Sequence, residues 1–267
     1  MTETIAFLGV GVMGETLLAG VLAGGTSPGD VLIAERRPER AAEVARQHGV
    51  SALSAEEAAA RATVIVVSVK PQDVRATLSQ VQDSVRPNTL VVSVAAGVST
   101  AVLERNLPRG CPVVRVMPNT PALVGQGMAA ISPGAHCSPE HVARAKALLA
   151  ATGDVIEVPE YQQDAVTAVS GSGPAYVFYV VDAMIEAGVL LGLPRPVATR
   201  LAVQTLLGAA TMLKETGTHP VLLREQVSSP AGTTIAALRT LDAHGVRAAV
   251  VEAMIAARDR SAELSSD

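Results

Sequence analysis

A short hydrophobic run followed directly by spaced glycines constrains the fold of this chain more than any other feature. Residues 5–14 read IAFLGVGVMG, in which Gly9, Gly11 and Gly14 have the spacing G-x-G-x-x-G. Between a strand and a helix, such glycines permit a tight turn, a close approach of a pyrophosphate to the backbone, and close helix packing. A tight turn without a ligand would need the same glycines, but the strand before them and the helix after them favour a dinucleotide site.

Short β-branched runs alternate with alanine-rich runs up to about Val158, which is typical of βαβ units around a parallel sheet. Unbroken apolar runs such as Val64–Val67 indicate strands that are buried on both faces. The predicted strands are 4–8, 31–34, 64–69, 90–94, 113–116 and 128–132, and the predicted helices begin near Met13, Pro38, Ala55, Gln72, Thr100 and Pro139.

The β-branched runs end near Tyr161, and the rest of the chain predicts only helices, over 162–191, 196–216, 220–227, 233–243 and 246–261. The run 202–210 (AVQTLLGAA) is apolar on more than one face, whereas a surface helix of a monomer has a narrower apolar stripe. The additional apolar surface indicates either an oligomer interface or burial inside the helices' own domain. We predict an α/β chain with a Rossmann-type parallel-sheet domain over 1–160 and an all-α domain over 161–267.

Charge and cysteine content exclude several classes of protein. The formal net charge is −4 and the 21 lysine and arginine residues are scattered, so a nucleic-acid partner is not expected. The two cysteines form no C-x-x-C pair, which argues against a metal site and against a disulfide framework and favours a cytoplasmic protein. No apolar stretch approaches ~18 charge-free residues without glycine or proline, and no signal-peptide pattern is present, so no membrane association is expected.

The run Glu35–Arg37 follows the second predicted strand and bears on the choice of cofactor. An acidic side chain here binds a ribose hydroxyl of NAD, whereas Arg36 and Arg37 suit the 2′-phosphate of NADP if Glu35 points away or pairs with one of them. Alternatively, Glu35–Arg37 is an ordinary solvent-exposed helix start before Pro38. We favour NADP and leave NAD possible.

Three later segments lie where strand ends should line the cofactor crevice. Ser68–Pro71 and Ala95–Gly97 each follow a predicted strand, and Lys70 either reaches a ribose or phosphate oxygen or is an exposed lysine before a helix. Asn119 stands between two prolines in MPNTP and is either held near the nicotinamide or is a turn former. We therefore assign the cofactor to Gly9, Gly11, Val12, Met13, Gly14, Glu35, Arg36, Arg37, Val69, Lys70, Pro71, Ala95, Ala96, Gly97 and Asn119.

The stretch 227–242, VSSPAGTTIAALRTLD, places hydroxyls, a proline and a glycine before a strongly helical run. Ser228, Ser229, Thr233 and Thr234 can cap that helix, and Gly232 lets a small ligand approach the unpaired N–H groups at its positive end. A carboxylate suits such a site. A dinucleotide at one end of the chain and a small acid at the other suggest a reductase.

Taken together, these motifs closely resemble the pyrroline-5-carboxylate reductase family along nearly the whole chain. The matching segments are FLGVGVMG at the start, SVKP at 68–71, VSVAAGV at 92–98, RVMPNTPALVGQGM at 115–128, SGSGPAY at 170–176 and HPVLLREQVSSPAGTTIAALRTLD at 219–242. The last segment is the most specific of them. SGSGPAY is also compatible with a simple helix start at Pro174.

The resemblance implies reduction of 1-pyrroline-5-carboxylate, a cyclic imino acid, to L-proline with NADPH. It also implies a helical domain that interleaves with a partner's to form a homodimer, rings of dimers such as a decamer, and an active site shared between subunits. The substrate carboxylate is expected on Ser228, Ser229, Gly232, Thr233 and Thr234. The family commonly has two glycines after the proline, whereas this chain has Ala231 and Gly232, so we expect a right-handed Ala231 or a reshaped loop.

No His, Asp or Glu of the matched motifs stands out as an acid for reduction of a C=N bond. The substrate then arrives protonated as an iminium, or it takes a proton from water or from the Thr234 hydroxyl, which makes Thr234 the candidate catalytic residue. Capping of the helix is the competing role for Thr234. The related β-hydroxyacid dehydrogenases use a lysine on the long helix, and 162–191 contains none. A regulator that only senses NADP is the non-enzymatic alternative.

Overall fold

The structure, a computed structural model, describes residues 3–266, which fold into two compact units. One unit runs to Ser172 and takes in the end of the chain from Ala257, and the other is Gly173–Ala256. The predicted domains, 1–160 and 161–267, divide the chain by expected secondary structure, whereas these units divide it by contacts.

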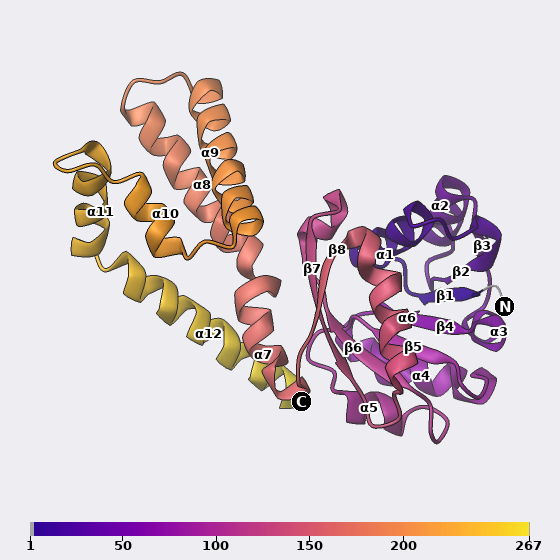
Figure 1. Ribbon diagram of the computed structural model, residues 1–267. Coiled ribbons are helices and arrows are strands. Elements are labelled where there is room, and N and C mark those ends of the chain that lie inside the picture. The colour runs from indigo at the N-terminus through magenta and orange to yellow at the C-terminus, as the bar shows by residue number, and fades with distance from the viewer. Residues whose placement is uncertain (1–2, 267) are drawn as a thin grey trace. The chain divides into compact units, whose positions relative to one another are not determined.

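The first unit is built on one eight-stranded sheet with the order β3-β2-β1-β4-β5-β6-β7-β8 (Figure 1). All neighbouring strands are parallel except β6 and β7, which are antiparallel. The mostly parallel sheet confirms the predicted α/β class. The strands are β1 (Ile5–Leu8), β2 (Val31–Ala34), β3 (Ser51–Ala52), β4 (Val64–Val67), β5 (Leu90–Ser93), β6 (Val113–Met117), β7 (Gly127–Pro133) and β8 (Gly153–Glu157).

Helices cover both faces of the sheet, which explains the unbroken apolar strands. Alternate residues of β1 point to opposite sides: Ile5 and Phe7 join a core with α1, α2 and α6, while Ala6 and Leu8 join one with α3, α4 and α5. The helices of this unit are α1 (Val12–Ala23), α2 (Pro38–His48), α3 (Ala55–Arg61), α4 (Val74–Val81), α5 (Thr100–Arg105), α6 (Pro139–Leu149) and α7 (Gln163–Val166).

Two strands, β3 and β8, were not predicted, because neither is a buried run of β-branched residues. β3 has only two residues, both exposed, and pairs with β2 at an outer position of the sheet. β8 begins at Gly153, whose φ is +144°, and its residues are exposed or half-buried. The antiparallel β7 was predicted as a strand but within a parallel sheet, because strand direction depends on the connection and not on local composition.

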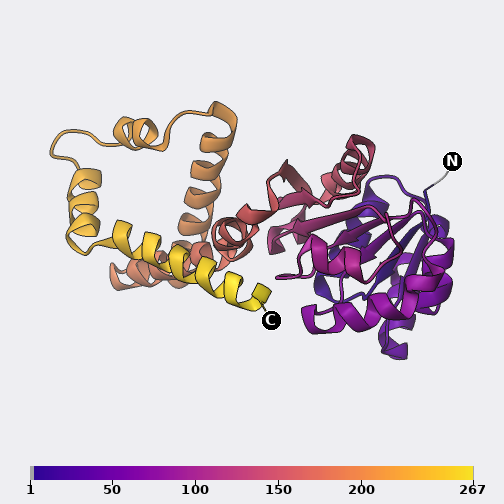
Figure 2. The ribbon, with the colours of Figure 1, turned by 90° about the horizontal axis from the view of Figure 1, so that it is seen from below.

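The second unit contains only helices, as predicted, and leaves much of their apolar surface uncovered. α8 and α9 pack closely where Gly188 meets Ala198, and Figure 2 shows α10 and α11 standing apart from this pair. Phe178 and Leu207 are 65% and 58% exposed. The helices are α8 (Gly173–Leu190), α9 (Arg195–Thr216), α10 (Pro220–Gln226), α11 (Thr233–Ala243) and the first part of α12 (Val246–Ser266). Burial within their own unit therefore does not account for these side chains.

The predicted helix over 162–191 is not uniform. It begins with α7, continues as a π-helix over Thr167–Gly171, and becomes α8 at Gly173. By length and composition, the stretch Glu160–Leu190 (31 residues), which contains an 18-residue window of mean hydropathy 1.3, is apolar enough to cross a membrane. The stretch was not predicted to span a membrane, because it contains glycines, a proline and charged residues.

The loop before α11 contains an alanine in the left-handed region. Ala231 has φ +55°, so the expected right-handed Ala231 is wrong, and the other alternative, a slightly reshaped loop, stays a prediction. An L-residue with a Cβ atom pays roughly 1–2 kcal/mol for this conformation. The loop therefore holds local strain directly before the α11 N-terminus.

Replacing Ala231 by glycine is expected to stabilise the protein by about 0.5–1 kcal/mol, because the strain it removes exceeds the added entropy of the unfolded chain. The measurement is the midpoint of urea unfolding at one fixed protein concentration. Ala237→Gly, inside α11, is the matched control and should destabilise by about 1 kcal/mol. Equal destabilisation by both substitutions would contradict the strain at Ala231.

Candidate active site

The three glycines of the first turn occupy three different environments. Gly9 has φ +90°, and a Cβ atom built there would lie 2.9 Å from Val69 Cγ1. A Cβ atom on Gly14 would lie 2.5 Å from Ser68 Oγ and 2.6 Å from the Gly9 carbonyl oxygen. A Cβ atom on Gly11 would meet nothing within 4 Å. Gly9 thus makes the turn, Gly14 permits close packing, and Gly11 leaves its open side for a ligand.

Helix α1 begins in this turn with free donors. Gly11 is its N-cap residue, and within residues 3–266 no side chain caps the helix. The backbone N–H groups of Gly11, Val12, Met13 and Gly14 have no hydrogen-bond partner in the described part of the chain. Unpaired N–H groups at the positive end of a helix form a site for phosphate. The turn therefore fits the pyrophosphate of a dinucleotide.

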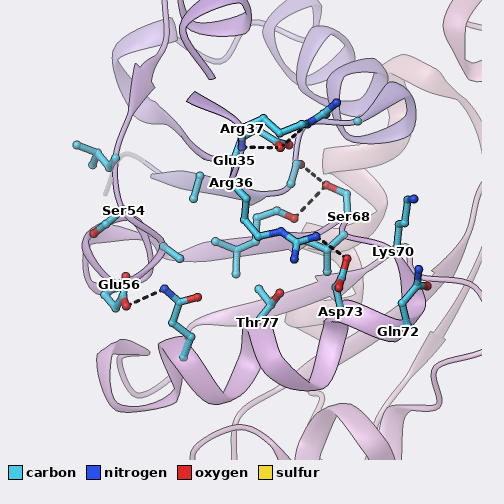
Figure 3. A pocket seen from close by; sticks show the side chains of 18 residues that line it. Glu35, Arg36, Arg37, Ser54, Glu56, Ser68, Lys70, Gln72, Asp73 and Thr77 are labelled. Carbon is cyan, nitrogen blue, oxygen red and sulfur yellow. Dashed lines mark hydrogen bonds and ion pairs between the residues drawn. The ribbon is translucent and has the colours of Figure 1, made fainter. Parts of the chain in front are cut away.

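A cleft of about 570 Å³ opens at the carboxyl ends of β1, β2 and β4, beside this turn (Figure 3). Parallel sheets bind ligands at this edge. Of the residues predicted to hold the cofactor, the cleft brings together Gly9, Gly11, Glu35, Arg36, Arg37, Val69 and Lys70. Its other lining residues are Leu8, Ala34, Leu53, Ser54, Ala55, Glu56, Ser68, Gln72, Asp73, Thr77 and Gln80.

Glu35 is committed to contacts inside the protein. Its Oε2 accepts a hydrogen bond from the Val10 N–H at 3.2 Å, and its Oε1 accepts from Arg37 Nε at 3.0 Å and from the Arg37 N–H at 3.1 Å. Burial opposes ionisation of this carboxyl, but the hydrogen bonds from Arg37 and Val10 outweigh it and lower the pKa of Glu35. Pairing with Arg37 is the arrangement that the sequence analysis connected with NADP.

Arg36 and Lys70 supply positive charge to the mouth of the cleft. Figure 3 shows Arg36 reaching across to Asp73, and its Nη2 lies 2.6 Å from Asp73 Oδ2. The Arg36 side chain is 78% exposed, so this pair contributes little to stability. The Lys70 ammonium has no hydrogen bond or ion pair with any described residue. Asp73 was missed because it lies far from Arg36 in sequence and only the fold joins them.

Several predicted cofactor residues do not line the cleft, namely Val12, Met13, Gly14, Pro71, Ala95, Ala96, Gly97 and Asn119. Gly97 packs against the end of α12, where its Cβ atom would lie 3.2 Å from the Leu264 carbonyl oxygen. The Asn119 amide donates to the Ser170 carbonyl at 3.1 Å and accepts from the Met128 N–H at 2.8 Å. Asn119 therefore joins β7 and the π-helix to the loop after β6, a role beyond that of a simple turn former.

The predicted substrate residues lie in the helical unit. The Ser228 hydroxyl donates to the Arg224 carbonyl at 2.6 Å, whereas the hydroxyls of Ser229, Thr233 and Thr234 have no partner among the described residues. The N-cap of α11 is Gly232, and among residues 3–266 no side chain caps the helix. The expected capping by serine and threonine is thus wrong, because the N-cap position falls on Gly232, which has no side chain to accept a hydrogen bond. Uncapped N–H groups and free hydroxyls remain for an anion.

Known proteins match nearly the whole chain. A family model described as pyrroline-5-carboxylate reductase dimerisation matches residues 160–264, and one described as NADP oxidoreductase coenzyme F420-dependent matches residues 4–97. A pyrroline-5-carboxylate reductase of Corynebacterium melassecola is 47% identical over 98% of this chain and 98% of its own length. This chain belongs to the pyrroline-5-carboxylate reductase family. The predicted oxidoreductase class and NADP-type domain are confirmed.

Solved structures of the family share the fold. A pyrroline-5-carboxylate reductase from Coxiella burnetii has a TM-score of 0.94 with 34% identity and covers 99% of both chains. A pyrroline carboxylate reductase from Plasmodium falciparum, solved with NADP bound, has a TM-score of 0.88 with 27% identity over 98% of both chains. The match of residues 160–264 to the dimerisation model supports homo-oligomerisation.

Replacing Arg36 by alanine is expected to raise the Kd for NADPH about tenfold and the Kd for NADH less than about twofold, because only NADPH carries the 2′-phosphate. Fluorescence titration of the two reduced cofactors measures both constants. Arg75→Ala, an exposed arginine of α4 outside the cleft lining, is the control. Equal weakening of both cofactors would remove Arg36 from the choice between them.

Proposed function

We propose that this chain reduces 1-pyrroline-5-carboxylate to L-proline with NADPH, the last step of proline biosynthesis. The observation that carries the proposal is the similarity to pyrroline-5-carboxylate reductases along 98% of the chain, which joins the glycine turn to the loop before α11. When bound, NADPH supplies the hydride that adds to the imine carbon, and a proton on the ring nitrogen completes the amine.

The backbone of α1 holds the pyrophosphate in this proposal. The free N–H groups of Gly11, Val12, Met13 and Gly14 support it, together with the open side of Gly11. Lys70 and Arg36 bind the 2′-phosphate, and Glu35 fixes Arg37 beside them. Val69, Pro71, Ala95, Ala96, Gly97 and Asn119 stay proposed walls of the site toward the nicotinamide.

The loop 228–234 binds the substrate carboxylate in this proposal. The uncapped α11 N-terminus at Gly232 and the free hydroxyls of Ser229, Thr233 and Thr234 support it, since both donate hydrogen bonds to an anion. Ser228 is part of this loop, but its own hydroxyl is bonded to the Arg224 carbonyl. A carboxylate held at one end leaves the ring free to present its C=N carbon.

Thr234 is the catalytic residue of the proposal. Its hydroxyl has no partner among the described residues and is free to bind the ring or to pass a proton to the imine nitrogen. A substrate that already carries the proton as an iminium needs only to be oriented by this side chain. Orientation of two bound reactants supplies several kcal/mol of the barrier reduction.

A second copy of the chain covers the exposed apolar helices in this proposal. The dimerisation match over 160–264 and the exposure of Phe178 and Leu207 support a homodimer through the helical domain 161–267, with the dinucleotide-binding domain as 1–160. The apolar stretch Glu160–Leu190 then faces protein rather than lipid. We extend the proposal to a decamer assembled from five such dimers, located in the cytoplasm.

The purified protein should oxidise NADPH when 1-pyrroline-5-carboxylate is added, and it should reduce NADP when L-proline is added at alkaline pH, where proton release favours the reverse reaction. Absorbance of the reduced nicotinamide follows both directions. A protein that binds NADPH but leaves it unchanged with either substrate is a sensor of the cofactor and not the proposed reductase.

Thr234→Ala should lower kcat/KM for the cyclic imine by about 10- to 100-fold, because it removes a donor to the reacting ring. Thr234→Ser, which keeps the hydroxyl, should recover most of the loss. Thr240→Ala is the matched control on the same helix, since the Thr240 hydroxyl donates only to the Ala236 carbonyl at 3.2 Å. Unchanged steady-state kinetics in Thr234→Ala would take this residue out of the mechanism.

A further inference from the structure

Val10, the middle residue of the glycine turn, is held on both sides by charged side chains. It is fully buried, its N–H donates to Glu35 Oε2 at 3.2 Å, and its carbonyl accepts from Arg40 Nε at 3.2 Å. Glu35 lines the cleft, but Arg40, on α2, does not. The turn is therefore held by a guanidinium that lies outside the lining of the cleft, where a ligand in the cleft does not touch it.

The Arg40 guanidinium is itself fixed. Its Nη2 pairs with Glu15 Oε2, and its Nη1 lies 2.8 Å from Glu43 Oε2. Glu15 stands in the first turn of α1 and also contacts His48 Nε2 at 3.1 Å. The side chains of Arg40 and Glu15 are each 21% exposed. Because three of its nitrogens are bonded, the fork cannot turn without breaking several charge-assisted contacts.

The peptide that joins Val10 to Gly11 transmits this constraint to the cleft. The described chain contains no cis peptide bond, so the C=O and N–H of this planar group point in opposite directions. With the Val10 oxygen held on the α2 side, the Gly11 N–H is directed away from α2. Gly11 lines the cleft and has open space beside it. A cationic donor on the carbonyl also polarises the peptide and strengthens its N–H as a donor.

We propose that Arg40 is a positioning residue for the dinucleotide, which fixes the Gly11 N–H for the pyrophosphate by holding the Val10 carbonyl. The inference rests on the proposed binding of NADPH in this cleft. Glu15 acts one step further out, because it holds the Arg40 fork. Both reduced cofactors contain the pyrophosphate, so the effect of Arg40 is the same for each, unlike that of Arg36.

The test replaces Arg40 by methionine, which keeps much of the stem and removes the donors. Calorimetric titration of ADP-ribose, which contains the pyrophosphate, should show a Kd about tenfold higher, as expected for one charge-assisted contact. Titration of adenosine 2′-monophosphate, which lacks the pyrophosphate, should change less than about twofold. In the assay of 1-pyrroline-5-carboxylate reduction, the KM for NADPH and the KM for NADH should rise by the same factor, while kcat at saturation stays within about twofold.

Arg46→Met is the matched control, since Arg46 is an exposed arginine of the same helix with no hydrogen bond or ion pair among the described residues. Arg40→Lys should recover part of the affinity for ADP-ribose, because lysine keeps one charged donor. If Arg40→Met does not fold, Glu15→Gln should show a smaller loss with the same preference for the pyrophosphate ligand.

An unchanged Kd for ADP-ribose would overturn the proposal, and so would an equal loss for ADP-ribose and adenosine 2′-monophosphate, which would indicate a merely structural tie. The titrations need no turnover. If the wild-type protein binds ADP-ribose but does not reduce the cyclic imine, the proposed function fails while the role of Arg40 is still decided.

Discussion

The geometry of the cleft depends on the close contact between the glycine turn after β1 and the segment after β4. Gly9 meets Val69, Gly14 meets Ser68, and the Ser68 hydroxyl donates to the Gly9 carbonyl at 2.6 Å. Side chains at either glycine would push the two strand ends apart. Because they stay together, α1 starts at the edge of the sheet and its free N–H groups lie beside the cleft.

Much of the sheet unit follows from local sequence, since most of its strands are short, unbroken apolar runs and its turn needs glycine. Residues 64–67 predict a buried strand, and the G-x-G-x-x-G run predicts a tight turn before a helix. Glu35–Arg37 was expected near the cleft because it follows a strand end, and these residues line it. The partners of these side chains were not predictable. The contacts of Arg36 with Asp73 and of Arg40 with Val10 join residues that are far apart in the sequence, and no local sequence pattern predicts them.

The helical unit shows a different limit of sequence reasoning. Its surplus of apolar faces indicated either an oligomer interface or burial inside the helical domain, and the exposure of side chains such as Phe178 argues against the second alternative. Local propensity failed at the loop before α11, where serine and threonine were expected to cap the helix and Gly232 takes the N-cap instead. It failed again at Ala231, whose left-handed backbone is imposed by the path of the loop and not by the residue.

The carboxylates beside the two arginines at the mouth of the cleft make cofactor choice a competition. Arg36 pairs with Asp73 and Arg37 pairs with Glu35. An incoming phosphate exchanges one anionic neighbour for another and so gains only the difference between them. Discrimination at this mouth is accordingly graded rather than absolute, and the loss or gain of a single acidic side chain would be enough to retune it.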